Sequence, residues 1–422
     1  MTRGITDPDA PIAPPEPPLL SASQVGGQRV WTVSRHADVL AVLRSPSFRS
    51  VSVEERIERI AGRAGRDYRH LLALLRGTMI FQQDERHQDS RRRVRALIDE
   101  ALARWPAARL QAEARRIVAA LPAEPGEIDV VPALAEPLPS LLIGEALGLP
   151  PALCLALQKR ALAVTQSWLS SMALRDLDRL EAEAAELRAM MRANRAPGWR
   201  IGRLAEEASD DAIDLALFLL LAGSHSVAGT IAAALDILAR QGGLQARLRP
   251  DRALGADFLR ETLRLAGPLR RLNRRVAAVE AEIGGARILP GDLMLLPIDR
   301  AHRDPAAFAE PEHVDLTRKG VVLLAFGSGA HVCQGRVLGA QEAEVMVQAV
   351  LERFTLRPAT DRGVLLAHED WRTFYRLPLL LHRVDAGDGA SPSAVGDLPG
   401  SCPRHGPGIL THANSQEESG IG

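Results

Sequence analysis

The chain has 422 residues, of which 46% are apolar and 25% are charged, and these shares are typical of a folded globular protein rather than a disordered one. Lysine plus arginine and aspartate plus glutamate both number 52, which excludes the basic excess of a nucleic-acid-binding protein. The three cysteines, Cys154, Cys333 and Cys402, are spread too widely to indicate a disulfide framework, so a reducing, cytoplasmic setting is expected.

The first half of the chain is predicted to be mainly helical. Residues 1–19 are expected to form an extended lead-in because they are rich in proline. The N-terminus lacks the basic-then-apolar order of a signal peptide, so none is expected. A short strand is predicted at residues 30–33 and a helix at 36–43. Further helices are predicted, from apolar periodicity and the breaks between segments, at 92–121 with an interruption at Pro106, at 132–148, at 151–168 and at 171–195.

The longest helical signal runs from about residue 211 to 240 and contains no proline. Asp210 and Asp211 suit its positive N-terminus, and Gly242 follows its end. Its first half is apolar on nearly all sides, so we expect it to cross the protein interior. The longest apolar run, 215–223, falls well short of the ~20 residues of a membrane-spanning helix, so no membrane segment is expected.

The pattern changes after a further helix predicted at residues 252–265. Residues 275–297 alternate and are interrupted by glycine and proline, which predicts short β-hairpins. An irregular, charged stretch follows at 301–318, and a glycine-rich loop then leads into a helix that ends near residue 354. Residues 385–422, rich in glycine, serine and proline, are expected to be a disordered tail.

The glycine-rich loop contains one cysteine, and its sequence over residues 326–335 is F-G-S-G-A-H-V-C-Q-G. Glycines allow backbone N–H groups to turn toward the sulfur, and the N-terminus of the following helix adds positive potential. Both effects lower the pKa of a thiol and favour Cys333 as a thiolate metal ligand. The alternative, taken from the spacing alone, is an inert buried cysteine that packs as a small apolar residue.

This loop resembles the haem-binding loop of the cytochrome P-450 family, F-G-x-G-x-H-x-C-x-G, and Leu338 and Glu342 fit the family pattern in the helix after it. The resemblance implies a mainly α fold with a small β region, a triangular helical prism that encloses haem b, over residues 20–384. It implies that Cys333 is the axial thiolate ligand of the iron, which favours O–O cleavage. Within the loop, the resemblance also implies that the amides of Gln334 and Gly335 hydrogen-bond to the sulfur and that the ring of Phe326 packs against the haem. Gly327 is a further implied cofactor contact.

Glu261 and Arg264 match the E-x-x-R motif of the same family. Residues at positions i and i+3 share a helix face and can form an ion pair. The resemblance implies a buried structural pair that a third polar group completes, and His313 stands where that group belongs. The alternative is a solvated pair of little energetic value.

Four cationic positions are expected to bind the haem propionates. His87 and Arg91 match the family's H-x-x-x-R pair, although residues 84–86 lack the prolines that usually precede it. Arg275 matches an arginine on a β-strand, and His331 lies inside the cysteine loop. Each of these residues, taken singly, is also compatible with an ordinary surface charge.

The long helix carries Ala222-Gly223-Ser224-His225-Ser226, which resembles the family's oxygen-activation segment, A-G-x-[DE]-T. Small residues such as Ala222 and Gly223 leave room there for O₂. His225 stands in place of the acid and Ser226 in place of the threonine. Ser226 keeps a hydroxyl for a water-linked proton relay, and His225 can donate or accept a proton near neutral pH. The alternative is that both side chains only satisfy helix carbonyls.

The resemblance implies a cytoplasmic, monomeric monooxygenase of bacterial secondary metabolism that inserts one oxygen atom of O₂ into a small organic substrate by hydroxylation or epoxidation. It implies ferredoxin and an NAD(P)H-dependent ferredoxin reductase as electron donors. The altered His225-Ser226 pair favours one alternative, a haem-thiolate enzyme that carries out peroxide-driven oxidation, decarboxylation or C–C coupling. The intact Cys333 disfavours a second alternative, a catalytically silent activator of a partner enzyme.

No single residue specifies the substrate. Arg56, Arg59, Arg63 and Arg66 recur at helical spacing and could receive an acidic substrate or one bound to a carrier protein. The alternative is a row of solvated charges on one helix face.

Overall fold

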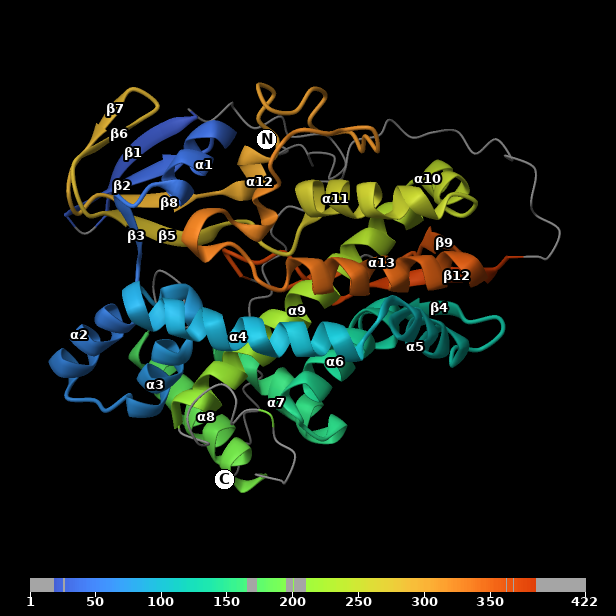
Figure 1. The fold of residues 1–422 in the computed structure, drawn as a ribbon, viewed down its shortest axis with the longest axis horizontal. Coiled ribbons are helices and arrows are strands. Elements are labelled where there is room, and N and C mark those ends of the chain that lie inside the picture. The colour runs from blue at the N-terminus through green and yellow to red at the C-terminus, as the bar shows by residue number, and fades with distance from the viewer. Residues whose placement is uncertain are drawn as a thin grey trace, which may run out of the picture.

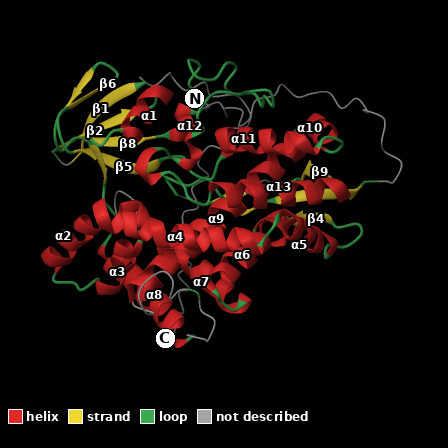
Figure 2. Cartoon of the chain, viewed as in Figure 1, coloured by secondary structure: helices red, strands yellow, loops and turns green. Residues whose placement is uncertain are grey.

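The computed structural model describes residues 19–25, 27–164, 173–194, 200, 210–361, 363–366 and 368–384. The predicted tail and nearly all of the predicted lead-in lie outside these residues. Figure 1 shows helices over most of the molecule and a β-rich region, together with the first helix, at one corner of it. The same division is clear when the chain is coloured by secondary structure (Figure 2). The fold is therefore mainly α with a small β region, as predicted.

Helices account for most of the described chain. The α-helices are α1 (His36–Arg44), α2 (Glu54–Ala64), α3 (Arg69–Gly77), α4 (Asp84–Arg104), α5 (Ala107–Ala119), α6 (Pro137–Leu147), α7 (Pro151–Val164), α8 (Leu174–Ala193), α9 (Asp210–Arg240), α10 (Gly242–Leu248), α11 (Gly255–Ala266), α12 (Ile298–Ala301) and α13 (Arg336–Arg353). Short helical turns occur at η1 (Met79–Phe81), η2 (Val131–Ala135), η5 (Arg252–Leu254), η6 (Leu324–Phe326) and η7 (Gly329–His331).

The predicted helices are present, with changed bounds. The segment predicted at 92–121 forms α4 and α5, and α4 begins earlier, at Asp84. Pro106 separates them with a φ of −62°, the value that its ring imposes, and it directly precedes the first residue of α5. The early start of α4 was missed because its first turns are charged and mostly not buried, so they carry little apolar periodicity.

The strands form four small sheets within the described chain. One sheet has the order β1-β2-β8-β5-β3 and another the order β4-β12-β9, while β6 pairs with β7 and β10 with β11. The strands are β1 (Leu20–Val25), β2 (Gln28–Val33), β3 (Phe48–Ser50), β4 (Gly126–Asp129), β5 (Leu272–Ala277), β6 (Ala281–Ile283), β7 (Ala286–Ile288), β8 (Leu293–Leu296), β9 (Phe354–Pro358), β10 (Val364–Leu365), β11 (Phe374–Arg376) and β12 (Pro378–Arg383).

The prediction of successive hairpins over residues 275–297 is right only for β6 and β7. They are joined by Gly284 and Gly285, whose φ values of 59° and 80° suit glycine. Strands β5 and β8 flank this hairpin and pair with each other. Strand β8 also pairs in parallel with β2 near the N-terminus, a long-range pairing that local alternation does not reveal.

Helix α9 passes through the middle of the molecule, as its apolar sequence predicts (Figure 1). The apolar residues of 212–220 belong to one core, with α3, α7 and α8, and most apolar residues of 227–239 belong to a second, with α5, α6 and α13. The helix is also long and apolar enough to cross a bilayer, but 78% of its most apolar window is buried inside the protein. Its apolar surface is therefore covered by neighbouring helices, as in a core helix.

Candidate active site

A large cavity lies between α9 and the cysteine loop, residues 326–335. Its volume of about 630 Å³ falls within the ~300–1,000 Å³ of small-molecule and cofactor sites. Helix α9 contributes Ala222, Gly223 and Ser226 to the wall, and the loop contributes Cys333. The remaining wall is mainly apolar, so the cavity suits a largely apolar ligand.

The cysteine loop is shaped by main-chain contacts and by glycine. The N–H group of Cys333 donates to the carbonyl of Phe326 at 2.8 Å, which closes the loop. Gly327 and Gly329 both have a φ of 67°, and a Cβ at Gly329 would stand 2.3 Å from the carbonyl oxygen of Leu43. Glycine is therefore required where the end of α1 packs on the loop. Helix α13 starts three residues after Cys333, as predicted.

The Cys333 thiol is accessible from the cavity that it lines. Burial raises its pKa, while a hydrogen bond from the Gly335 N–H group, the charges of Arg336 and Arg91, and the Arg336 N–H group act in the opposite direction. Burial is the largest effect, so the net shift is opposite to the one that the loop sequence predicts. The amides that reach the sulfur are those of Gly335 and Arg336. Gln334 instead donates its side-chain amide to the Arg91 carbonyl at 2.8 Å.

The four predicted cationic residues all line this cavity. The rings of His87 and His331 are stacked, with centroids 4.0 Å apart. Arg91 donates to the carbonyl of Val332 at 2.9 Å, next to the cysteine. Arg275 is 5% exposed and donates to the carbonyl of Asn273 at 2.9 Å. Residues from α4, β5 and the loop therefore meet at one place, although they lie up to 244 positions apart.

The charges and burial of these four cationic residues favour the binding of an anion among them. Burial, followed by the charges of neighbouring residues, lowers the pKa of His87 and lowers that of His331 to about 3. Burial lowers the pKa of Arg275 to about 10, and within the described chain no carboxylate forms an ion pair with it. The Nε2 atom of His87 is buried without a hydrogen-bond partner. These residues fit a cofactor that carries carboxylates, as haem b does with its propionates.

The α9 segment places serine, but not histidine, at the cavity. The Ser226 hydroxyl lines the wall and donates to the Ala222 carbonyl at 2.6 Å. Thr230, one turn further, also lines the wall and donates to the Ser226 carbonyl at 2.8 Å. The sequence analysis missed Thr230, although its spacing of four from Ser226 places it on the same helix face.

The structure corrects the predicted position of His225, which was expected to face the cavity. His225 is absent from the described residues that line the cavity, and its Nε2 atom lies 3.3 Å from the Gln158 carbonyl of α7. Burial lowers its pKa, so the ring is neutral at physiological pH. As adjacent helix positions, 225 and 226 point about 100° apart, and in this structure the histidine is directed toward α7 while the serine lines the cavity.

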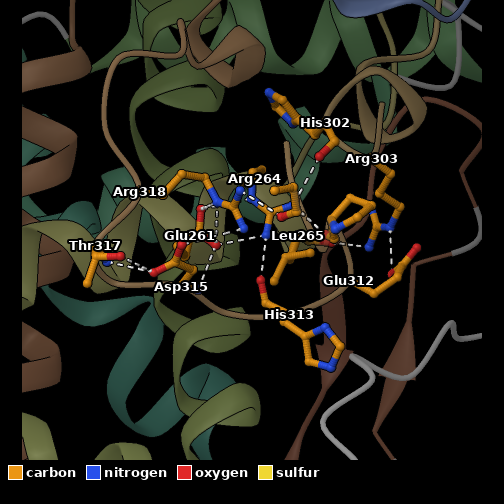
Figure 3. A network of polar contacts seen from close by, with 12 residues as sticks. Glu261, Arg264, Leu265, His302, Arg303, Glu312, His313, Asp315, Thr317 and Arg318 are labelled. Carbon is orange, nitrogen blue, oxygen red and sulfur yellow. Dashed lines mark hydrogen bonds and ion pairs between the residues drawn. The ribbon is translucent and has the colours of Figure 1, made fainter. Parts of the chain in front are cut away.

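Figure 3 shows a buried polar network around Arg264. The side chains of Arg264 and Glu261 are 1% and 2% exposed, and their bidentate contact has two distances of 2.8 Å. All five N–H donors of the guanidinium are used. The acceptors are both carboxylate oxygens of Glu261 and the carbonyls of His302, Pro311 and His313.

His313 joins this network differently from the prediction. Its main-chain carbonyl accepts from Arg264 at 2.8 Å, while its imidazole points away (Figure 3). The third ionic side chain is Arg318, whose Nε atom lies 3.4 Å from the Glu261 carboxylate. The His302 ring accepts a hydrogen bond from the N–H group of Leu324 at 2.9 Å, directly before the cysteine loop. The network therefore fixes the stretch 302–318 and, through it, the start of the loop.

Glu342 is a further buried polar residue of the cavity. It lies on α13, is 2% exposed and lines the wall, and one of its carboxyl oxygens has no hydrogen-bond partner. Burial raises its pKa to about 8, so it is mainly protonated at neutral pH. The sequence indicated Glu342 as part of the family pattern but gave it no role.

Comparisons with known proteins define the family. A sequence model described as Cytochrome P-450 matches residues 203–381. Cytochrome P-450 105C1 of a Streptomyces species is 31% identical over 60% of this chain and 68% of that protein. The cyclomarin C epoxidase CymV of Salinispora arenicola is 29% identical over 78% of this chain and 84% of that protein.

The fold agrees with solved structures. P-450 BioI, in complex with a fatty-acid-bearing acyl carrier protein, has a TM-score of 0.72 at 21% identity and covers 86% of this chain and 94% of its own. The epothilone B-bound P-450 epoK has a TM-score of 0.68 at 25% identity and covers 83% and 91%. The chain belongs to the cytochrome P-450 family, and it is accordingly a haem b oxidoreductase of the monooxygenase class.

Proposed function

We propose that this chain is a soluble, cytoplasmic enzyme of bacterial secondary metabolism that hydroxylates or epoxidises a small organic molecule with one oxygen atom of O₂. The observation that carries the proposal is one apolar cavity with a thiol, a carboxylate-free cluster of cations and a helix hydroxyl in its wall. Relatives with an epoxidase name and with the name 6-deoxyerythronolide B hydroxylase support both reaction types. Ferredoxin and an NAD(P)H-dependent ferredoxin reductase are the proposed electron donors, and the proposed active form is a monomer.

Cys333 is the residue that would hold the haem iron through its thiolate. Thiolate-ligated haem supplies reductive activation of O₂, because the thiolate pushes electron density toward the iron. The N–H groups of Gly335 and Arg336 hold the sulfur and partly offset the burial that opposes its ionisation. Gly335 has no atom within 4 Å of where a Cβ would stand, which leaves this edge of the cavity free. Phe326 and Gly327 line the same wall.

His87, Arg91, Arg275 and His331 are the proposed contacts of the propionates. A propionate beside Arg275 would offset the free-energy cost of keeping its guanidinium charged at a buried position. The bound carboxylates would also raise the pKa of the two stacked imidazoles, because an opposite charge favours the protonated ring. The Glu261–Arg264 network is proposed to be structural, since its contact toward the cysteine loop runs through His302 to the N–H group of Leu324, two residues before the loop.

Ser226 is the proposed hydroxyl that steadies a water during proton delivery. Its hydroxyl is bound to the Ala222 carbonyl, so it can accept a hydrogen bond from water without losing that contact. Serine lacks the methyl group that restricts χ1 in threonine, so its orientation is less fixed. His225 is proposed to fasten α9 to α7 through Gln158 rather than to carry protons.

The test is oxygen incorporation from ¹⁸O₂ with NADH, ferredoxin and ferredoxin reductase, on a substrate found by haem spin-state screening. We expect one ¹⁸O atom per product and no product without the electron donors. The second candidate, a peroxide-driven or non-hydroxylating oxidation, is favoured by the absence of an acid at position 225. A peroxide-driven oxidation predicts turnover with hydrogen peroxide alone, and a decarboxylation or C–C coupling predicts a product without ¹⁸O from O₂. Either outcome would replace the proposal.

A further inference from the structure

The cavity wall holds a small polar network apart from the residues proposed to bind haem and oxygen. It consists of Ser50, the last residue of β3, Ile80 in η1, Gln83 directly before α4, and Asn273 near the start of β5. All four residues line the cavity, although Ser50 and Asn273 are 223 positions apart in the chain. The network therefore joins three segments of the wall that are far apart in the sequence.

Ser50 is the centre of this network. It is 3% exposed, and its hydroxyl donates to the Ile80 carbonyl at 2.6 Å. The side-chain amide of Asn273 donates to that hydroxyl, and its nitrogen lies 3.2 Å from the Ile80 carbonyl and 3.3 Å from the Val51 carbonyl. The side-chain amide of Gln83 donates to the Ser50 carbonyl at 2.7 Å. Both amides therefore use their nitrogen, and not their oxygen, to hold the wall together.

These contacts fix the orientation of both amides. A main-chain carbonyl can only accept a hydrogen bond, so the end of each amide that faces one must be the NH₂ group. The side-chain oxygens of Asn273 and Gln83, which we call the amide pair, consequently lie at the ends directed away from these carbonyls. Within the described chain no group donates to either oxygen, and neither oxygen is fully buried. Two hydrogen-bond acceptors are thus accessible in the wall of a mainly apolar cavity.

The amide pair favours a neutral hydrogen-bond donor over a charged group. An amide oxygen accepts a hydrogen bond from a hydroxyl or from an N–H group. An ammonium group would lose hydration that two uncharged oxygens do not replace inside an apolar cavity, and a carboxylate would meet two further acceptors. A molecule without any donor would leave both oxygens unpaired once it displaced water from them.

We propose that the amide pair accepts a hydrogen bond from a neutral hydroxyl or N–H group of an otherwise apolar substrate. The inference rests on the proposed function, because the amide pair is a subsite of the same cavity. Apolar residues such as Leu219, Leu263 and Leu269 also line the cavity and would surround the rest of the molecule. A substrate held at its donor group presents a fixed carbon to the oxidising centre, so the amide pair would also determine regioselectivity.

The test uses imidazoles that bind the iron of the haem-loaded protein and carry a saturated chain of graded length on the ring. The chain ends in a hydroxyl, an acetylamino or a methoxy group, and only the methoxy compound lacks a donor. Optical titration of the Soret band gives each dissociation constant. At one chain length we expect at least one donor-bearing compound to bind about fivefold or more tightly than the methoxy compound. The better of the two identifies the donor.

The variants Gln83→Met and Asn273→Leu remove the two oxygens at nearly constant side-chain size. The double variant should abolish the preference for the donor and leave binding of the methoxy compound nearly unchanged. A role limited to holding the wall would instead weaken all three compounds alike. The matched control is Gln82→Met, because Gln82 donates to the Arg76 carbonyl at 2.8 Å in the same way, but it is not among the described residues that line the cavity.

Equal binding of the three compounds at every chain length would overturn the inference, as would a preference that survives the double variant or an equal loss in Gln82→Met. If the variants fold poorly, chain length decides in the unaltered protein. A donor site at a fixed place requires one best length, and a preference that is equal at all lengths contradicts it. Failure of the proposed function is separate, because it would appear as product without ¹⁸O from O₂, whatever the order of affinities.

Discussion

Removal of the Arg264 side chain should destabilise the protein far more than removal of an exposed arginine with the same spacing. In Arg264→Ala the Glu261 carboxylate, which is 2% exposed, loses its main cation. Breaking a buried ion pair by deleting one partner costs about 3–5 kcal/mol. Three main-chain carbonyls, those of His302, Pro311 and His313, also lose their hydrogen bond from Arg264. Leaving a buried acceptor without its partner destabilises the folded protein by about 1–3 kcal/mol, and the effects add up to less than their sum because the groups share one network.

The matched control is Arg116→Ala on α5. Arg116 pairs with Glu113 at the same i,i+3 spacing, but its side chain is 69% exposed. Exposed pairs of this kind contribute little to stability, so Arg264→Ala should be clearly the more destabilising of the two variants. Arg264→Lys should fall between them, because an ammonium has three donors for five acceptors.

The assay is urea unfolding of the haem-loaded protein, followed by far-ultraviolet circular dichroism and by the Soret band. Arg264→Ala should lower the free energy of unfolding and lose haem at a lower urea concentration than the control, because the network holds the stretch that leads to the cysteine loop. If Arg264→Ala loses no more stability than Arg116→Ala, the network is not the anchor that its geometry indicates.

Three further predictions concern the cavity wall. Arg275→Gln should speed haem transfer to a scavenging apoprotein, whereas Arg274→Gln should not, and equal rates would contradict the assigned propionate contact. The pKa of Glu342 is about 8 in the folded state, above the 4.5 of an exposed glutamate. The free energy of unfolding should therefore be independent of this group below pH 4.5 and should decrease as the pH rises from 4.5 toward 8, by up to ~1.4 kcal/mol per pH unit. Glu342→Gln should flatten that slope in unfolding titrations, and an unchanged slope would mean that Glu342 ionises freely in the folded protein. Ser226→Ala should raise the peroxide released per NADH while His225→Ala leaves it nearly unchanged, and the reverse order would restore His225 as the proton carrier.

The parts of the fold that the sequence predicted depend on local signals. Helix α9 was found from its acidic start, its apolar first half and the glycines after it, all within one segment. The cysteine loop was found because its glycines and cysteine stand in one run of ten residues directly before a helix. In contrast, the parallel pairing of β2 with β8 joins residues about 260 positions apart, and neither strand carries a signal for the other.

The site was predicted as a set of residues, but their orientation was not. His225 and Ser226 are neighbours in sequence, and only the packing of α9 against α7 decides that the serine lines the cavity. His313 was expected to use its side chain and uses its carbonyl, since any residue can offer a main-chain acceptor there. The charge of Arg56 was visible in the sequence, but its position beside Arg274 depends on the fold.

The central claim, that Cys333 is the thiolate ligand of haem, is tested most directly by the ferrous–CO spectrum of the purified protein. Cys154→Ser is the control, because Cys154 is 1% exposed, its thiol donates to the Ser140 carbonyl, and burial raises its pKa to about 12. The unaltered protein and Cys154→Ser should both show the red-shifted Soret band of a thiolate-ligated haem, and Cys333→Ser should lack it. A red-shifted band that persists in Cys333→Ser, or that is missing from the unaltered haem-loaded protein, would contradict the account.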